Sequence, residues 1–241
     1  MEEKEIKIQV SKKIFDRVKK LIVGKKLKEK VKKQTDIYFD NELMSITNLN
    51  RGLRIRFNGN VVSQLEFKSL FFNKHTRKDN PWYIEEISLD MPLNKKSYKK
   101  LDSILQRLAV SLPRLEMETL DYKGLKIALA NVGLYPKITV TKDRQEFVGK
   151  NAIYVFDYIK ELGYFIEIET NDGTDPLKII NKVIGNKDYS FIRNGYNDMV
   201  AKNIDNYLSN EVKQLLFKIN HQWNILPTEE KLVDKLLSSY K

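Results

Sequence analysis

Charged and apolar residues alternate along short segments of this chain, and this alternation limits the folds that it can adopt. In residues 3–10, ionisable side chains occupy odd-numbered positions (Glu3, Glu5 and Lys7), and aliphatic side chains occupy even-numbered positions (Ile6, Ile8 and Val10). Strand side chains point alternately to two faces, so this segment predicts a strand with one apolar and one charged face. A solvated edge strand would show the same pattern, and this segment alone leaves both interpretations open.

The same alternation recurs in later segments. Further strands are expected at residues 34–40, 53–57, 65–68, 82–89, 137–147, 153–157 and 164–169, which are rich in β-branched and aromatic residues. Asn58-Gly59-Asn60 lies between two of them and is typical of a hairpin turn. Summed over the strands, one face would carry six acids and six bases: Glu3, Glu5, Glu86, Asp157, Glu167 and Glu169 with Lys7, Arg54, Arg56, Lys68, Lys142 and Arg144.

Apolar residues at helical spacing predict helices between and after these strands. Ser11 can cap a helix that ends near Gly24, and Asp175-Pro176 can open a helix that runs through Ile184. We expect one domain at residues 1–202 with a helical insertion at about 92–133, and a C-terminal helical extension at residues 203–241. The extension would pack on the sheet or on a second copy of the chain, which would make a homodimer.

A face with this many charges must be hydrated, because an unpaired buried ion costs several kcal/mol or more. We therefore expect an α+β fold in which a mainly antiparallel sheet closes into a barrel with a water-filled tunnel, while helices cover its apolar outside. Acids and bases on one face suit a polyanion bound together with divalent cations. Carboxylates bind such cations, and Arg and Lys neutralise phosphate oxygens.

The composition narrows the choice of metal and compartment. The chain has no cysteine and only two histidines, His75 and His221, which excludes disulfides, thiolate sites and a histidine-rich zinc centre. Carboxylate ligands suit Mg²⁺ or Mn²⁺. No run of about 18 apolar residues is present, and the first residues lack an apolar signal region, so we expect a cytoplasmic protein with no membrane partner.

Positive charge is concentrated near the N-terminus. The net charge is +11, and residues 11–33 contain eleven Lys or Arg against Asp16 and Glu29. Such a stretch can bind nucleic acid or another acidic surface, although it is more often the solvated face of a helix. It lacks the interleaved aromatic residues of a groove for single-stranded nucleic acid.

In combination, five motifs of this chain resemble those of a known family: Glu3-x-Glu5-x-Lys7, Leu53-Arg54-Ile55-Arg56, Lys142-x-Arg144, Asp157-x-x-x-x-Leu162-Gly163-x-Phe165-x-Glu167-x-Glu169, and Gly195-Tyr196-x-x-Met199. The family is CYTH, or triphosphate tunnel metalloenzymes, and the resemblance covers roughly residues 1–200. It implies an eight-stranded antiparallel tunnel that binds a linear triphosphate together with one or two Mg²⁺ or Mn²⁺ ions.

The resemblance also implies roles for individual residues. The expected metal ligands are Glu3, Glu5, Glu86, Asp157, Glu167 and Glu169, with Glu85 as an alternative to Glu86. The expected substrate contacts are Lys7, Arg54, Arg56, Lys68, Lys142, Arg144 and Arg193. Glu5 and Lys7 are the expected catalytic residues, because a carboxylate such as Glu5 can orient or deprotonate the nucleophile.

Two reactions and one binding role stay open on the sequence. The first is hydrolysis of the terminal phosphate of a nucleoside, thiamine or inorganic triphosphate. The second is the class IV adenylyl cyclase reaction, which converts ATP into cyclic AMP and pyrophosphate. The third is binding without turnover of a triphosphate, a polyphosphate or an RNA 5′ end, with residues 11–33 contacting the rest of the ligand. Hydrolysis needs no pocket for a base and is therefore placed first.

Overall fold

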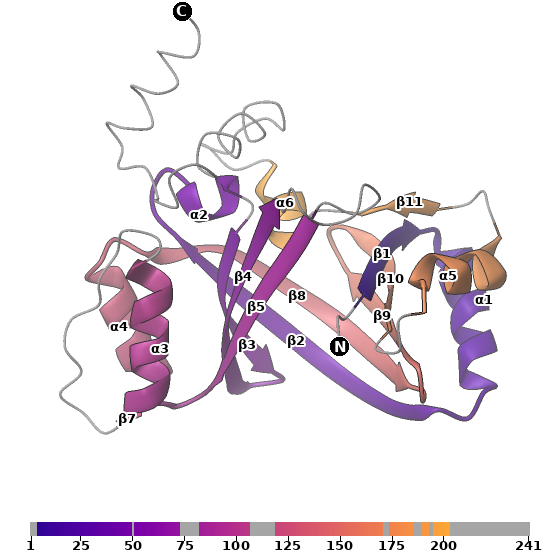
Figure 1. The fold of residues 1–241 in the computed structure, drawn as a ribbon, viewed down its shortest axis with the longest axis horizontal. Helices are drawn as coiled ribbons and strands as arrows, with labels where there is room; N and C mark the ends of the chain where they lie inside the picture. The colour runs from indigo at the N-terminus through magenta and orange to yellow at the C-terminus, as the bar shows by residue number, and fades with distance from the viewer. Residues whose placement is uncertain are drawn as a thin grey trace, which may run out of the picture. The chain divides into compact units, whose positions relative to one another are not determined.

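The structure is a computed structural model of the chain (Figure 1). It describes residues 4–49, 51–72, 82–106, 119–170, 174–185, 189–192 and 195–202. The chain divides into two compact units, and each is described by itself below. The first unit is Met1–Thr35 with Val140–Val200, and the second is Asp36–Thr139 with Ala201–Lys241. The predicted helical extension at residues 203–241 lies outside the described residues.

Nine strands form one sheet, and two of them, β2 (Lys28–Asp40) and β8 (Tyr135–Val148), contribute residues to both units. The other strands of this sheet are β1 (Lys4–Val10), β3 (Arg51–Asn58), β4 (Val61–Phe72), β5 (Trp82–Asp90), β9 (Ala152–Ile159), β10 (Gly163–Thr170) and β11 (Tyr189–Phe191). Their order is β11-β1-β10-β9-β8-β2-β3-β4-β5. A short pair, β6 (Leu93–Asn94) with β7 (Thr119–Leu120), stands apart from it.

The expected α+β class with a large antiparallel sheet is confirmed. β1 pairs with β10 and β11, β10 with β9, β9 with β8, β3 with β4, and β4 with β5, all antiparallel. Because β1 has a partner on each side, it is not an edge strand. The strand order of the described residues is open, ending at β11 and β5, so closure into an eight-stranded barrel stays a prediction.

In the first unit, two helices cover the apolar face of the sheet. The Ser11 side chain accepts a hydrogen bond from the Ile14 N–H and caps α1 (Lys12–Val23), which ends at Gly24 as predicted. Asp175 caps α5 (Pro176–Ile184). Both helices contact β10 and each other (Figure 1). The buried core between helices and strands includes Ile8, Phe15, Val18, Ile22, Phe156, Ile166, Ile168 and Ile180.

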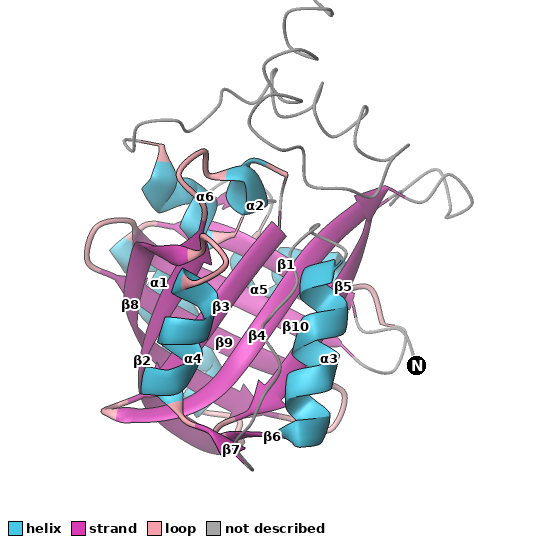
Figure 2. Ribbon diagram, turned by 90° about the vertical axis from the view of Figure 1, so that its left-hand side faces the viewer, coloured by secondary structure: helices cyan, strands magenta, loops and turns pink. Residues whose placement is uncertain are grey.

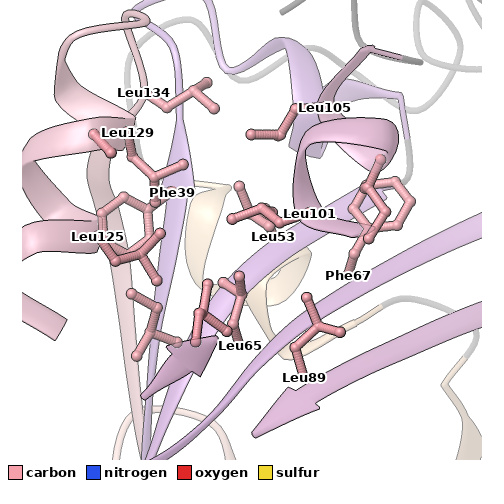
Figure 3. Close-up of a cluster of buried hydrophobic side chains, with 14 of the residues drawn as sticks. Phe39, Leu53, Leu65, Phe67, Leu89, Leu101, Leu105, Leu125, Leu129 and Leu134 are labelled. Atoms are coloured by element: carbon pink, nitrogen blue, oxygen red, sulfur yellow. The ribbon is translucent and has the colours of Figure 1, made fainter. Parts of the chain in front are cut away.

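In the second unit, α3 (Lys95–Gln106) and α4 (Tyr122–Ala130) lie over β3 and β4 (Figure 2). Both helices lie within residues 92–133, the range in which a helical insertion had been expected. Their apolar stripes meet the strands in a buried cluster (Figure 3), whose members include Leu53, Leu65, Phe67, Leu101, Leu105, Leu125 and Leu129. The remaining helices are α2 (Ser45–Asn48) and α6 (Tyr196–Ala201).

One strand begins earlier than the sequence predicted. The strand had been expected at residues 34–40, yet residues 28–33 already form the first part of β2. Side chains of β2 contact those of β8 here: Glu29 with Gln145, Lys32 with Glu146, and Thr35 with Thr141. Pairing with a neighbouring strand therefore outweighs the low strand propensity of lysine. Within the described part of the chain, the helices are too short or too polar to span a bilayer.

Candidate functional site

The first unit gathers ionisable side chains on the sheet face opposite α1 and α5. Cross-strand register places Glu5 opposite Glu169 and Lys7 opposite Glu167. On the neighbouring strands, Arg144 is opposite Asp157. Directly paired residues of antiparallel strands share a face, so the predicted alternation of charge is confirmed at these positions. We define the first cluster as Lys7, Lys142, Arg144, Asp157, Glu167 and Tyr196.

Arg144 holds both carboxylates of the first cluster. Its Nε and Nη2 donate to the two oxygens of Asp157 at 2.8 and 2.5 Å, which is the bidentate geometry of a strong ion pair. Its Nη2 also donates to Glu167 Oε2 at 3.0 Å. Lys7 Nζ lies 2.8 Å from Glu167 Oε1, and Lys142 Nζ lies 3.9 Å from Asp157 Oδ2. Five charged groups predicted from sequence are thus brought into contact.

Tyr196 of α6 joins the same groups from outside the strands. Its hydroxyl lies 2.9 Å from Asp157 Oδ2 and 3.1 Å from Glu167 Oε1, and a hydroxyl with one proton donates to one of them at a time. Lys7 Nζ is 4.4 Å from the centre of the Tyr196 ring, within cation–π range. No role for this tyrosine had been predicted, although it belongs to the Gly195-Tyr196-x-x-Met199 motif.

Burial makes these charges interdependent. Asp157 is fully buried, and Lys142 and Glu167 are nearly so. Burial acts to raise the pKa of Glu167, but Lys7, Arg144 and Lys142 outweigh it and hold that pKa well below its usual range. Burial acts to lower the pKa of Lys7, and Glu167 and Glu5 raise it instead. Burial and the two carboxylates raise the pKa of Tyr196 well above its usual value. At neutral pH the tyrosine is therefore a neutral donor between charged groups.

The second unit holds a separate group of buried charges on β2, β3 and β4. We define the second cluster as Asp36, Tyr38, Arg54, Arg56 and Glu66. Arg56 donates to both oxygens of Asp36 at 2.8 and 3.0 Å and to Glu66 Oε1 at 2.8 Å. Arg54 donates to Glu66 Oε2 through Nε at 2.7 Å and through Nη2 at 2.5 Å, and to the Tyr38 hydroxyl at 2.9 Å. Two arginines and two carboxylates thus neutralise one another.

Asp36 and Glu66 were missed as site residues. The strands that contain Asp36 and Glu66 had been expected, but neither acid was assigned a role. Both are almost completely buried. Burial acts to raise the pKa of Glu66, and Arg54 with Arg56 lowers it below its usual value. The alternation of Gln34, Asp36 and Tyr38 in β2 was the available signal for this second acid.

Lys68 and Glu86 form a more exposed pair in the second unit. Lys68 Nζ lies 2.7 Å from Glu86 Oε2, and about two fifths of each side chain is exposed, at 38% and 42%. The register pairs Lys68 with Glu86 and Ser69 with Glu85. Glu86 therefore shares the face of Lys68. Two other predicted site residues, Glu3 and Arg193, lie outside the described residues.

The acidic residues of the first unit were tested for their fit to a metal ion. The described part of the chain contains no preassembled group of three or more carboxylate or imidazole ligands. Arg144 contacts Asp157 and Glu167, and Glu5, whose carboxylate lies 3.8 Å from Lys7 Nζ, stands directly opposite Glu169 on β1 and β10. Like charges placed opposite each other destabilise a sheet, and a divalent cation offsets this repulsion. This all-oxygen donor set fits a hard ion such as Mg²⁺ or Mn²⁺.

Comparison with protein families identifies the chain at this point. The model of the CYTH domain matches residues 1–196, which contain both clusters. The chain belongs to the CYTH family. Members of this family are triphosphatases or have been assigned as adenylyl cyclases, and they typically depend on divalent metal ions. The resemblance stated from the motifs is thus confirmed. A comparison with curated protein sequences gives no match.

Solved structures agree with this family at the level of the fold. The PH1819 protein of Pyrococcus horikoshii is similar with a TM-score of 0.50 and 18% identity, over 83% of this chain and 99% of the other. The Hippeastrum protein HpAC1, assigned as an adenylyl cyclase and described as having a dominant triphosphatase activity, is similar with a TM-score of 0.50 and 16% identity. That match covers 81% of this CYTH chain and 92% of HpAC1. At these identities, the similarity defines the fold and not the reaction.

Proposed function

We propose that this CYTH protein is a divalent-metal-dependent triphosphatase that hydrolyses the terminal phosphate of a nucleoside, thiamine or inorganic triphosphate. The observation that carries the proposal is the first cluster. It holds three cations, of which Lys142 is buried and Lys7 and Arg144 are half-buried, on the sheet face that also carries Glu5 and Glu169. Such a face attracts a polyanion and a cation together more readily than either one alone.

The balance of charge supports this pairing of ligands. The first cluster together with Glu5 and Glu169 contains three cations and four carboxylates, namely Asp157, Glu167, Glu5 and Glu169. A triphosphate alone would add negative charge to this slightly negative group, which is unfavourable at short range. A polyanion that arrives with a divalent ion avoids this penalty. This argument also disfavours a purely binding role, because a simple polyanion binder gains nothing from so many acids.

The basic residues would bind and stabilise the phosphates. Lys7, Lys142 and Arg144 are proposed as contacts to the triphosphate in the first unit, and Arg54, Arg56 and Lys68 in the second, with Arg193 outside the described residues. Stabilisation of the charge that develops on the transferred phosphoryl group supplies most of the catalysis in phosphoryl transfer. The buried surroundings of Lys142 and Arg144 strengthen this effect, because screening by water is weaker there.

The carboxylates would divide into two roles. Glu5 and Glu169 would hold a metal ion together with Glu3 in the first unit, and Glu86 is proposed as a metal ligand within the second unit. Asp157 and Glu167 keep Arg144 and Lys7 in position, and each becomes a metal ligand only when its basic partner turns to the phosphate. When bound, Mg²⁺ or Mn²⁺ supplies Lewis-acid stabilisation of phosphate oxygens. Glu5 orients the attacking water or accepts its proton, and Lys7 beside it binds the phosphate under attack.

Product analysis tests this proposal. The purified protein is incubated with Mg²⁺ or Mn²⁺ and, separately, with ATP, thiamine triphosphate and inorganic tripolyphosphate. The proposal predicts orthophosphate and the corresponding diphosphate, and the fastest substrate identifies the branch of the family. Cyclic AMP with pyrophosphate would instead establish the adenylyl cyclase reaction, in which a ribose hydroxyl attacks the α-phosphate at the same cluster. Binding of all three compounds without any product would assign the protein a binding role.

A further inference from the structure

β2 carries a row of lysines on the same sheet face as the first cluster. Lys28, Lys30 and Lys32 are alternate residues of this strand and therefore share a face. Lys32 identifies which face this is, because its Nζ lies 3.1 Å from Glu146 Oε1. Glu146 has the parity of Arg144 and Lys142 along β8. All of these residues belong to the first unit. The row thus lies on the face of Arg144, and its innermost lysine, Lys32, contacts Glu146, two residues further along β8 than Arg144.

The outer part of this row carries uncompensated positive charge. Lys28 and Lys30 are exposed, and no described carboxylate lies within ion-pair distance of either. Lys32 is half-buried and pairs with Glu146. Alternate strand residues are about 7 Å apart, so the three ammonium groups extend over roughly 13 Å. The nearest acid of the strand, Glu29, has the opposite parity and contacts Gln145 instead.

The kind of ligand follows from what the row offers. It presents only flexible ammonium groups and no aromatic side chain, so it provides charge but no stacking platform for bases. Ammonium groups bind phosphates as point charges. Because the row is linear and lies on the same sheet face as Arg144, it fits a linear chain of phosphates that is longer than the segment held at the first cluster.

We propose that Lys28, Lys30 and Lys32 extend the phosphate-binding face, so that the preferred ligand is a long phosphate chain whose terminal triphosphate lies at Lys7, Lys142 and Arg144. This inference rests on the proposed function for the position of the triphosphate. Two ligands share this chemistry: inorganic polyphosphate and a single-stranded RNA with a 5′-triphosphate. In both, repeated phosphate charges follow one another along a chain.

A pair of matched double variants tests the row. Lys28→Ala/Lys30→Ala removes two exposed lysines from the proposed face. Lys13→Ala/Lys20→Ala removes the same charge from exposed positions of α1, the helix that covers the opposite face of the sheet. A short RNA with a 5′-triphosphate and a 3′ fluorophore serves as the probe, and its binding is followed by anisotropy at several salt concentrations with a fixed concentration of divalent ion present. Unlabelled inorganic polyphosphate and tripolyphosphate are the competitors.

The proposal predicts that the wild type binds at least one long ligand more tightly than tripolyphosphate. Each phosphate contact to a single strand contributes a slope of about 0.7 to the logarithmic salt dependence. Loss of two contacts therefore lowers the slope by about 1.4. As a result, the ratio of wild-type to variant affinity for the RNA is about 25-fold larger at 0.1 M than at 1 M salt, since 10 raised to about 1.4 is about 25. The Lys13/Lys20 variant keeps the wild-type slope. Equal losses in both variants, or none in the Lys28/Lys30 variant, would overturn the proposal.

Hydrolysis of tripolyphosphate separates this inference from the proposed function. The short substrate does not reach Lys28 or Lys30, so its kcat/KM is expected to stay unchanged in the Lys28/Lys30 variant. If the wild type hydrolyses no triphosphate but the variant loses RNA or polyphosphate binding, the proposed function fails and the lysine row stands. If hydrolysis is present while long and short ligands bind equally, only the lysine row fails. The stronger competitor identifies the source of the phosphate chain.

Discussion

Replacement of Tyr196 by phenylalanine tests the electrostatics of the first cluster with the smallest possible change. The substitution deletes one hydroxyl and keeps the ring, together with its contacts to Lys7 and Phe165. The hydroxyl donates to the carboxylate of Asp157 or Glu167, and hydrogen bonds to charged groups contribute about 1.5–3 kcal/mol. Both carboxylates keep their basic partners. We therefore expect the free energy of unfolding at pH 8 to fall by about 1.5–3 kcal/mol.

The pH dependence of this difference provides a second, more specific test. The pKa of Tyr196 is raised above its usual value of 10.0, so in alkali the unfolded chain loses this proton before the folded protein does. The tyrosine thus stabilises the folded state below pH 10, and its contribution falls as the pH rises through the shifted pKa. The slope is about 1.4 kcal/mol per pH unit. Tyr196→Phe has no hydroxyl to titrate and does not lose stability in this way. The difference in the free energy of unfolding between the wild type and the variant is therefore predicted to shrink above pH 10 and to disappear one to two pH units higher.

Urea unfolding followed by circular dichroism at pH 8 and at several values above pH 10 measures both quantities. The comparison is between two proteins at each pH, so the titration of other tyrosines and lysines cancels to a first approximation. A difference that is the same at pH 8 and pH 11 would refute the account of Tyr196 as a neutral donor between two charged carboxylates. A difference near zero at pH 8 would refute the hydrogen bonds themselves.

Three further predictions concern the charged groups. Arg144→Leu leaves the fully buried Asp157 without its bidentate partner and is expected to lower the free energy of unfolding by about 3–5 kcal/mol in urea denaturation, with part recovered in Arg144→Leu/Asp157→Asn. The pKa of Glu167 is depressed in the folded state, so its stabilising contribution is present above pH 4.5 and is lost as the pH falls through the folded-state pKa. In acid, the free energy of unfolding should therefore fall less steeply with pH in Glu167→Gln than in the wild type. An equally steep fall in both proteins would contradict this. Removal of divalent ions by EDTA is expected to abolish phosphate release while leaving the circular dichroism spectrum unchanged, and Mg²⁺ or Mn²⁺ should restore it; activity that persists in EDTA would exclude metal dependence.

The strand pattern of this protein was predictable because one physical rule governs most of it. In β1, β9 and β10, the apolar residues on one face of the sheet pack against α1 and α5, whereas the ionisable residues alternate with them and lie on the opposite face. That separation is visible in the sequence as alternation. The caps at Ser11 and Asp175 were predictable for a similar reason, since their side chains act on backbone groups only two or three residues away.

Features that depend on distant partners were not predictable. The first part of β2 forms a strand against β8, more than a hundred residues away, although its lysines disfavour strands by themselves. Asp36 and Glu66 become site residues through Arg54 and Arg56 of the strand between them. Tyr196 lies in a helix, so alternation along strands gave no reason to expect its hydroxyl between two carboxylates. In each case the deciding contact joins separate elements.

A comparison of kcat/KM between Lys7→Ala and Lys12→Ala tests whether the first cluster binds a triphosphate for metal-dependent hydrolysis. Each variant removes one ion-paired lysine, but Lys12 pairs with Asp16 on the exposed surface of α1, whereas Lys7 pairs with Glu167 in the cluster. Loss of one group that stabilises transition-state charge lowers the rate by about 10²- to 10³-fold, so Lys7→Ala is predicted to lose this much phosphate release with Mg²⁺ while Lys12→Ala retains the wild-type rate. Wild-type activity in Lys7→Ala would contradict the assignment of the active site to this cluster.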